Sequence, residues 1–329
     1  MLKDWRIVGH EWAVRLLQQA LERDELSHAY LFTGPPNVGK ETVAAALARA
    51  LLCEAEAGRP CDNCRGCHLL SSGNHPDLHH VEPDTAAGRV LIAQVRELSR
   101  QLSLTPSLGQ YRVAILSDFH RATPSAANAL LKTLEEPPPY VVLVLLAPDT
   151  DSLLPTIVSR CQVVPFQPVS ATKVEQALIE RWGVDAEQAQ LLAHVSGGRL
   201  GWAVTAATDP DALAARARRL EELDHLIHAS LVERFRYAEN LAHDPEAIQR
   251  TLDVWTGLWR DVMVVAAGAE GPLTNLDLTA RIRRLARALG MGQAAALVRA
   301  TRRAADLIRR NANPRLTLEV LIAFDLPRL

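Results

Sequence analysis

The hydrophobic residues of about the first 165 positions alternate between two spacings. Short, nearly continuous apolar runs occupy residues 29–32, 112–116 and 141–146, and the last two runs are rich in β-branched residues. Runs of this kind are typical of strands that are covered on both faces within a parallel sheet. Stretches with helical spacing lie between them, such as residues 42–52. This alternation predicts an α/β nucleotide-binding core.

The pattern changes after residues 165–168, where the strand signal ends. Residues 169–208 have the spacing of a small helical unit, with Ser170 as its predicted N-cap and a break at residues 197–198. From about Pro210 onward, long helical patterns rich in Ala, Leu and Arg follow. We therefore predict three domains, namely an α/β core over 1–166, a small helical domain over 167–208 and a helical C-terminal domain over 209–329.

Composition excludes some classes of protein. The chain has 329 residues, of which 48% are hydrophobic and 22% are charged, an ordinary balance for a globular protein. Its net charge of −2 argues against a protein that coats nucleic acid, because such proteins carry a basic excess, although a local basic face is compatible with it. No apolar run is long enough to cross a bilayer, and the first residues lack the apolar segment of a signal peptide, so we expect a cytoplasmic protein.

Residues 34–40, Gly-Pro-Pro-Asn-Val-Gly-Lys, match the first seven positions of the phosphate-loop motif G-x-x-x-x-G-K-[ST]. The match follows a predicted strand and opens a predicted helix, a context that favours a phosphate loop over a chance Gly/Pro turn. Gly34 and Gly39 would let backbone N–H groups turn toward phosphate oxygens, and Lys40 would reach the terminal phosphates.

The next position departs from the motif, because Glu41 stands where Ser or Thr normally holds Mg²⁺. A carboxylate is longer than a hydroxyl and brings negative charge close to the phosphates. Thr42 comes one residue later, rotated by about 100° around the helix, and cannot simply replace the missing hydroxyl. The sequence leaves the binding of ATP and Mg²⁺ open, since the glycines and the lysine persist while the metal position is altered.

Four of the five cysteines are Cys53, Cys61, Cys64 and Cys67, in the spacing C-x7-C-x2-C-x2-C. Two-residue gaps let successive thiolates turn back toward one ion, and four thiolates complete a tetrahedral zinc site without a position for water. We therefore predict structural zinc, with an iron–sulfur cluster or a redox disulfide as alternatives. The nearby histidines, which are alternative ligands, are His68, His75, His79 and His80.

Residues 128–138, with the sequence N-A-L-L-K-T-L-E-E-P-P, resemble the AAA+ clamp-loader subunits of bacterial DNA polymerase III. Active members of that family carry Asp-Glu-x-His at the end of the preceding strand, where the two acids hold Mg²⁺ and orient the attacking water. The matching residues here are Ser117, Asp118 and His120. If Asp118 is instead the metal-binding acid, Phe119 occupies the catalytic position. Either alignment lacks one acid.

Two further positions depart from the pattern of the active members. Residues 147–149, Ala-Pro-Asp, stand where the family's ATPases place a polar sensor of the γ-phosphate. In the predicted second domain, Gly201 matches an ATP-contacting arginine, and Arg199 lies two residues earlier. Together with the changes at the metal position, these departures predict that ATP hydrolysis is lost or very slow.

Arg160 lies in the sequence Ser-Arg-Cys at 159–161, which resembles a motif of the same family. In that family the arginine reaches into the ATP site of a neighbouring subunit, where a planar guanidinium stabilises the charge of the transition state. Without the match, a surface arginine at the end of a strand would be the simpler interpretation. The resemblance makes Arg160 the predicted arginine finger, and Cys161 is predicted to be a packed hydrophobic residue.

Arginines recur at helical spacing toward the C-terminus, in the tracts 281–287 and 302–310. They would suit a nucleic-acid face, but their interleaving with Leu, Ile and Ala equally fits amphipathic helices whose arginines rim a subunit interface. Residues 311–319 resemble the last helix of clamp-loader collar domains, which favours collar packing.

The resemblance spans most of the chain, and the degenerate ATP site, the finger and the cysteine cluster together point to the delta-prime type of subunit. It implies a AAA+ core with a zinc module, a helical lid and an all-α collar. It also implies a five-membered ring with gamma/tau ATPases and delta, which loads the sliding clamp onto primed DNA. Such a subunit would act as a stator without hydrolysing ATP itself. The alternatives are an active gamma/tau-type ATPase, a delta subunit and, outside the family, an independent P-loop NTPase.

Overall fold

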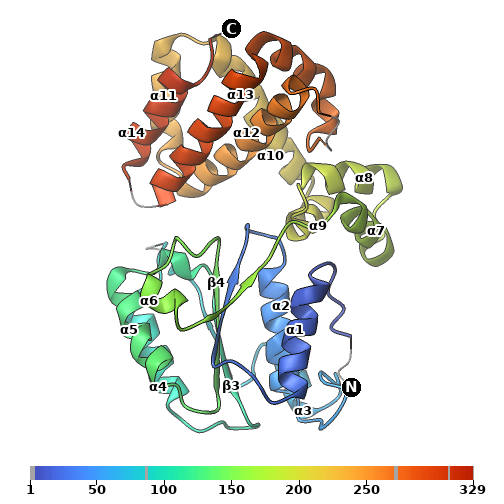
Figure 1. Ribbon diagram of the computed structural model, residues 1–329, viewed down its shortest axis with the longest axis vertical. Coiled ribbons are helices and arrows are strands. Elements are labelled where there is room, and N and C mark those ends of the chain that lie inside the picture. Colours follow the sequence, from blue (N-terminus) through green and yellow to red (C-terminus); the bar gives the residue numbers. More distant parts are fainter. Residues whose placement is uncertain (1–3, 86–87, 270–272, 310–311, 329) are drawn as a thin grey trace. The chain divides into compact units, whose positions relative to one another are not determined.

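The computed structural model describes residues 4–85, 88–269, 273–309 and 312–328 (Figure 1). The chain forms two compact units. The division into three domains stays a prediction, and Arg310 and Asn311 of the C-terminal patterns lie outside the described residues. The first unit comprises Met1–Val169 with Arg199–Gly201, and the second comprises Ser170–Gly198 with Trp202–Leu329.

A five-stranded parallel sheet forms the centre of the first unit, in the order β2-β3-β4-β1-β5. The inner strands β1 (Ala29–Thr33), β3 (Arg112–Leu116) and β4 (Val141–Ala147) are buried at every position and coincide with the predicted apolar runs. The edge strands β2 (Leu78–Val81) and β5 (Gln162–Pro165) have four residues each and are partly exposed, so no continuous apolar run marked them in the sequence. The predicted α/β fold class with a parallel sheet is confirmed.

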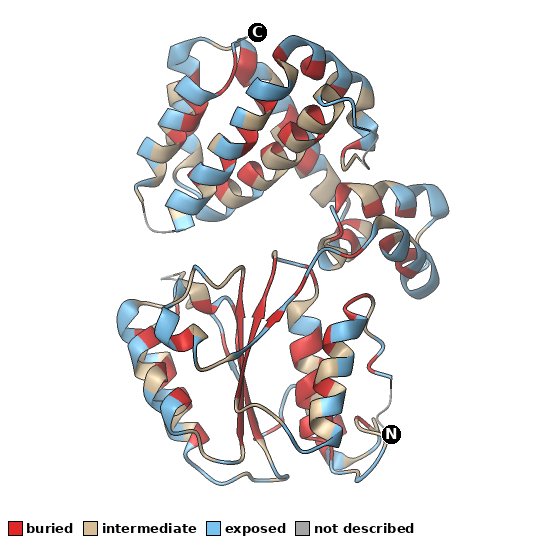
Figure 2. Cartoon of the chain, in the orientation of Figure 1, coloured by how far each residue is buried: buried red, intermediate tan, exposed pale blue. Residues whose placement is uncertain are grey.

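Helices cover both faces of this sheet (Figures 1 and 2). Helices α1 (Glu11–Glu22) and α2 (Lys40–Leu51) pack on one face, and α4 (Ile92–Leu102) and α5 (Pro124–Glu135) pack on the other. The even-numbered residues of β4 face α1 and α2, and its odd-numbered residues face α4 and α5. Both faces of the strand are therefore apolar. The shorter helices of this unit are α3 (Arg65–Ser71), η1 (Phe119–Arg121) and α6 (Pro155–Val158).

The second unit begins with two antiparallel helices, α7 (Ala171–Trp182) and α8 (Ala186–Val195). The Ser170 hydroxyl accepts a hydrogen bond from the Lys173 N–H, so the predicted N-cap is confirmed. The predicted break is confirmed as well, because α8 ends before residues 197–198, two glycines with positive φ.

The remainder of the second unit is helical and has its own core, which includes the fully buried Trp255 and Trp259. Arg234 is also fully buried and donates to three backbone carbonyl groups of residues 322–327, which fixes the C-terminal segment. None of the helices in the described part of the chain combines the length and apolar character that a membrane span requires. The remaining helices of the chain are α9 (Leu200–Thr208), α10 (Pro210–His228), α11 (Leu231–Leu241), α12 (Pro245–Ala266), η2 (Leu276–Leu278), α13 (Thr279–Arg309), α14 (Pro314–Glu319) and η3 (Val320–Asp325).

Candidate functional site

The phosphate loop connects β1 to α2 in the first unit. Gly34 and Gly39 have φ angles of +146° and +116°, a region that side chains strongly disfavour. A Cβ on Gly34 would lie 2.4 Å from the carbonyl oxygen of Phe166, so the loop needs glycine there for space as well. The Gly34 N–H donates to the carbonyl oxygens of Ala147 and Pro148 at 3.2 and 3.0 Å, which anchors the loop to the end of β4.

Lys40 is the first residue of α2 and turns back into the loop. Its Nζ donates to the carbonyl oxygens of Gly34 and Pro35 at 2.5 and 2.8 Å. Burial lowers the pKa of Lys40 to about 8, while the negative charges of Asp118 and Glu41 act in the opposite direction. The ammonium group is therefore placed at the loop, and the loop's own carbonyl groups already hold it.

Glu41 and Ser117 meet at the position where the motif would place a metal ion. Ser117, directly after β3, donates its hydroxyl to Oε1 of Glu41 at 3.1 Å. Active clamp-loader ATPases, as described above, place the hydroxyl on the helix and the carboxylate on the strand. The two groups have exchanged places in this chain and are bonded to each other. Thr42 is exposed on α2.

The turn after Ser117 offers the pocket a single acid. Asp118 has a φ of +47°, and its side chain is 58% exposed. Its Oδ1 lies 4.0 Å from Nδ1 of His120, which is an ion pair only when the ring is protonated. Phe119 belongs to the core between the sheet and helices α4 and α5, where it is fully buried. In the alignment that puts Phe119 at the catalytic position, that position therefore faces the core and not the pocket.

The segment Arg199–Gly201 belongs to the first unit and packs against the phosphate loop. The Gly201 N–H donates to the carbonyl oxygen of Asn37 at 2.9 Å, and a Cβ on Gly201 would lie 3.0 Å from the same oxygen. The position that matches the ATP-contacting arginine thus presents backbone to the loop and has little room for a side chain. At the sensor position, Asp149 accepts a hydrogen bond from the Ser152 N–H at 2.8 Å.

His10, the N-cap residue of α1, contacts the phosphate loop and was missed by sequence reasoning. Its Nε2 lies 2.9 Å from the carbonyl oxygen of Val38, and its ring packs edge-on against Phe166 with ring centroids 4.8 Å apart. A lone histidine before a helix belongs to no motif. Its role becomes visible only when the fold brings the two segments together.

The four clustered cysteines lie just after the end of α2. Their Sγ atoms are all within 4.8 Å of one another, and the Cys53–Cys64 and Cys61–Cys67 pairs are 3.9 Å apart. A tetrahedron with metal–sulfur bonds of about 2.3 Å has edges of about 3.8 Å, so the cluster fits a metal ion such as zinc. The four nearby histidines, all of them described, do not belong to the cluster.

Backbone N–H groups point at the cysteine sulfurs. The Cys61 N–H donates to Sγ of Cys53 at 3.3 Å, and the Cys64 N–H donates to Sγ of Cys61 at 3.3 Å. Hydrogen bonds from the backbone of Asn63 and Cys64 lower the pKa of Cys61 to about 6. Such bonds stabilise the thiolate of Cys61, which is the form that binds a metal ion, whereas burial raises the pKa of Cys53 and of Cys67.

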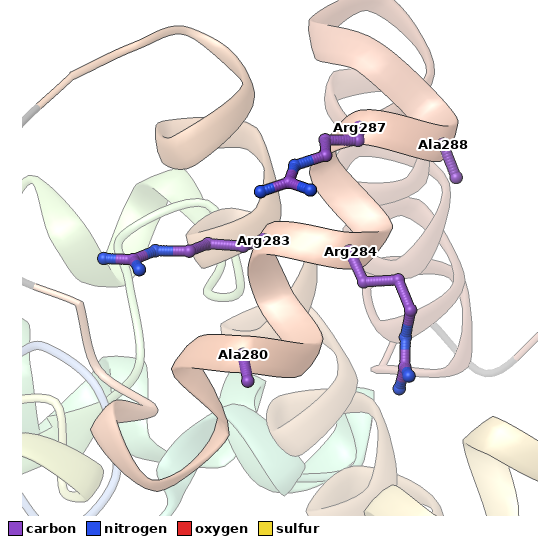
Figure 3. A pocket seen from close by; sticks show the side chains of 5 residues that line it. All are labelled: Ala280, Arg283, Arg284, Arg287 and Ala288. Carbon is purple, nitrogen blue, oxygen red and sulfur yellow. The ribbon is translucent and has the colours of Figure 1, made fainter.

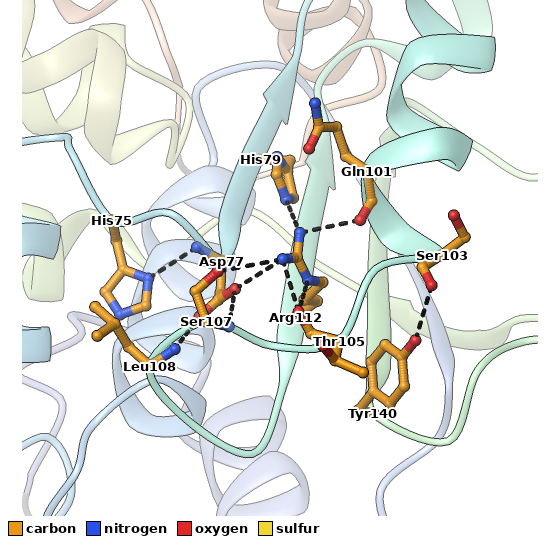
Figure 4. A network of polar contacts seen from close by, with 10 residues as sticks. All are labelled: His75, Asp77, His79, Gln101, Ser103, Thr105, Ser107, Leu108, Arg112 and Tyr140. Carbon is orange, nitrogen blue, oxygen red and sulfur yellow. Dashed lines mark hydrogen bonds and ion pairs between the residues drawn. The ribbon is translucent and has the colours of Figure 1, made fainter.

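A buried ion pair between Asp77 and Arg112 lies beside the start of β2 (Figure 4). Asp77 is fully buried, accepts the N–H groups of Ser107 and Leu108 at 2.8 and 2.9 Å, and lies 3.4 Å from the Arg112 guanidinium. Arg112 also donates to backbone carbonyl groups at the end of α4 and just after it. The network fixes the α4–β3 connection and gives Asp77 a structural role.

Arg160 follows the short helix α6. Its guanidinium donates to Oε1 of Glu135, at the end of α5, at 2.8 Å and to the carbonyl oxygen of Thr156 at 2.9 Å. The side chains of Arg160 and Glu135 are 34% and 50% exposed, so solvent reaches the pair. Burial raises the pKa of the neighbouring Cys161 thiol to about 12, as a packed and inert cysteine requires.

The chain is similar in sequence to known proteins. Residues 9–170 match the family model described as DNA polymerase III, delta subunit. The chain is 34% identical over 269 residues to the DNA polymerase III subunit delta' of Bacillus subtilis, and the alignment covers 80% of each protein. It is 38% identical over 192 residues to the subunit delta' of Pseudomonas aeruginosa, covering 57% of this chain and 58% of that protein. A DNA polymerase III gamma subunit-related protein of Thermotoga maritima aligns structurally over 95% of this chain and 99% of its own, with 18% identity and a TM-score of 0.43.

Proposed function

The chain belongs to the family of DNA polymerase III delta-prime subunits, and we propose on this premise that it is a clamp-loader stator that does not hydrolyse ATP itself. In this role Arg160 is the arginine finger for the ATP site of a neighbouring subunit. The proposed partners are gamma/tau-type ATPases and delta in a five-membered ring, through which the sliding clamp and primed DNA are reached. Residues 167–208 would be the lid, and residues 209–329 the collar.

The main support for this proposal is the arrangement of Glu41 and Ser117, in which the carboxylate lies on the helix and the hydroxyl follows the strand. In P-loop ATPases a neutral hydroxyl and a carboxylate from the strand hold Mg²⁺ against the β- and γ-phosphates. Here the carboxylate lies on the helix, next to the phosphate position, and it is already bonded to the hydroxyl of the strand. Asp118 alone cannot supply both a metal ligand and a group that orients water. These features support a pocket without a competent metal and base arrangement.

The environment of Arg160 supports the finger role. Its partner Glu135 is half-exposed, and exposed ion pairs contribute about 0–1 kcal/mol. A triphosphate of a neighbouring subunit can therefore take over the guanidinium at little cost. A planar guanidinium matches phosphate oxygens in two-point contacts, which a lysine would not reproduce.

We also propose that zinc is the ion held by Cys53, Cys61, Cys64 and Cys67. Four sulfurs close a tetrahedral shell, so the ion would have a structural role and bind no water. Cys53 comes two residues after the end of α2. The ion would thus hold the end of the helix that begins at the phosphate loop.

A Lys40→Ala variant in the reconstituted clamp loader tests whether this chain hydrolyses ATP. If its pocket takes no part in hydrolysis, DNA-stimulated ATP turnover of the assembled ring should stay at the wild-type rate. Turnover by the purified chain alone, with Mg²⁺, should stay at background. A clear fall in the ring's turnover on Lys40→Ala, with assembly intact, would instead support an active gamma/tau-type subunit. Brisk turnover by the isolated chain would support an independent NTPase.

A further inference from the structure

Helix α13 carries a concentration of positive charge that its surroundings leave unneutralised. Residues 281–309 contain eight arginines, no lysine and one aspartate, although the whole chain has a net charge of −2. Two of the eight, Arg281 and Arg309, are in ion pairs. The other six are exposed, and within the described parts of the chain no carboxylate oxygen lies within 4.0 Å of their guanidinium groups. These six are Arg283, Arg284, Arg287, Arg299, Arg302 and Arg303.

Three of them surround one hollow near the start of α13 (Figure 3). The hollow has a volume of about 620 Å³ and is lined by Arg283, Arg284 and Arg287. Arg283 and Arg287 are one helical turn apart and extend to the same side, while Arg284 points in another direction. The other lining residues are Ala280 and Ala288, whose small side chains leave the space open and add no charge.

Two acidic residues near this hollow are in ion pairs. Asp224 pairs with Arg281 at 2.8 Å, and Asp277 pairs with Arg216 at 2.7 Å. Burial lowers the pKa of Arg281, and the positive charge of the nearby Arg284 adds to this effect, although Asp224 opposes it. The exposed Glu221 also acts on Arg281, but no carboxylate oxygen of the described residues lies within 4.0 Å of the three guanidinium groups that line the hollow.

The same arrangement recurs beyond Gly290, where α13 is interrupted by a residue with a φ of +67°. A second hollow of about 350 Å³ is lined by Arg299, Arg302 and Arg303, together with Asp306 and Leu307. The carboxylate of Asp306 is bonded to Arg309. Two separate helical segments thus each present three exposed arginines around a hollow.

We propose that the hollow of Arg283, Arg284 and Arg287 binds the phosphate backbone of DNA. Guanidinium groups bind phosphate oxygens through paired hydrogen bonds, and three of them line one hollow, with no carboxylate oxygen of the described residues within 4.0 Å of any of them. None of the described residues that line the hollow is aromatic and able to stack on bases, so the contact is to the backbone and independent of base sequence. An acidic protein surface fits less well, because the lining offers no large apolar side chain to anchor an interface.

Binding of a short fluorescein-labelled DNA duplex by the full chain tests the proposal. The wild-type chain should bind at about 50 mM salt, with an affinity that falls steeply toward about 200 mM. The variant Arg283→Gln/Arg284→Gln/Arg287→Gln should bind at least about tenfold more weakly at low salt. Its slope of log affinity against log salt should be shallower by about 2.7, since each lost phosphate contact removes about 0.9.

The matched control is Arg100→Gln/Arg250→Gln/Arg315→Gln, which removes the same charge from three exposed arginines that have carboxylate partners. It should keep the wild-type slope, and both variants should unfold at the wild-type temperature. No binding by the wild-type chain, an unchanged slope in the first variant, or an equal loss in the control would each overturn the proposal. So would a variant that binds DNA normally but no longer assembles with other subunits, which would assign the hollow to a protein partner. ATP turnover is not measured, so the result is independent of the role of Arg160.

Discussion

The phosphate loop and Arg160, the proposed arginine finger, differ in how their charged groups are held. Lys40 donates to carbonyl groups of its own loop, and Ser117 donates to Glu41, so the groups of the pocket are bonded to one another. Arg160 is held by the half-exposed Glu135. Seating a metal–nucleotide complex in the pocket requires several of these bonds to be exchanged, whereas the exposed pair can release its guanidinium for about 1 kcal/mol or less. This difference is what the proposed function requires, with an inactive pocket and an available arginine in the same unit.

The largest effect is expected from Arg160→Ala in the reconstituted clamp loader. Removing the guanidinium should slow ATP hydrolysis at the neighbouring site by about 10³-fold or more, because an arginine finger contributes that much to phosphoryl transfer. DNA-stimulated ATP turnover in single-turnover experiments measures the loss at that site. Together with an unchanged rate for Lys40→Ala, this result would show that the chain contributes to ATP hydrolysis through Arg160 and not through its own pocket.

Arg96→Ala is the matched control, since Arg96 is an exposed arginine on α4 in the same unit. It should leave the turnover unchanged. Gel filtration should show the same assembly for both variants. Wild-type turnover in a fully assembled ring that contains Arg160→Ala would contradict the assignment of Arg160 as an arginine finger.

The next largest effect is expected from removing two ligands of the cysteine cluster, which follows the far end of helix α2. The variant Cys61→Ser/Cys64→Ser should lose the metal, and the preparation should fall from one zinc per chain to nearly none. A loss of about 2 kcal/mol would lower the melting temperature of a unit of this size by about 4–8 °C. Elemental analysis and thermal unfolding measure the two effects.

Cys161→Ser is the control for the metal prediction, because Cys161 lies outside the cluster. It should retain the zinc of the wild-type chain. A wild-type protein that is folded and metal-free, or a double variant with unchanged metal content, would contradict the zinc assignment.

Local sequence patterns predicted the inner strands of the sheet, but they did not predict hydrogen bonds and ion pairs between residues far apart in the sequence. Strands β1, β3 and β4 were predictable because nearly all of their positions are apolar, while the edge strands are short and partly exposed. The loop glycines and the cysteines were found because their spacing has a chemical reason. The hydrogen bond from Ser117 to Glu41, which are 76 positions apart, follows no periodicity. The same holds for His10 at the loop and for Asp77 against Arg112.

A smaller effect is expected from restoring the usual order of groups in the pocket. The variant Glu41→Thr/Ser117→Asp places the hydroxyl on α2 and the carboxylate after β3. We expect Mg²⁺ to strengthen ATP binding by about tenfold in this variant, since charge-assisted contacts contribute about 1.5–3 kcal/mol and part of that is offset by desolvation. Hydrolysis should stay at background, because the sensor and lid positions are still changed.

Titration with a fluorescent ATP analogue, with and without Mg²⁺, measures this effect. Thr42→Ala is the control, since Thr42 is exposed on the same helix and should leave binding as it is. If the wild-type chain already binds ATP with a strong dependence on Mg²⁺, the Glu41–Ser117 arrangement does not prevent metal binding. The proposed difference between the pocket and Arg160 would then lose its main support.

The smallest effect is expected from Glu135→Gln, which removes the charge that holds Arg160 but keeps a hydrogen-bond acceptor. The pair is half-exposed, so its loss should change the free energy of unfolding by about 1 kcal/mol or less. If Glu135 only holds the guanidinium until a triphosphate competes for it, turnover at the neighbouring site should rise by up to about fivefold, which is the same free energy expressed as a rate. A fall in turnover would show instead that Glu135 positions the finger in the assembled ring. The combination Glu135→Gln/Arg160→Ala separates the two cases, because without the guanidinium the change at Glu135 should have no effect on turnover.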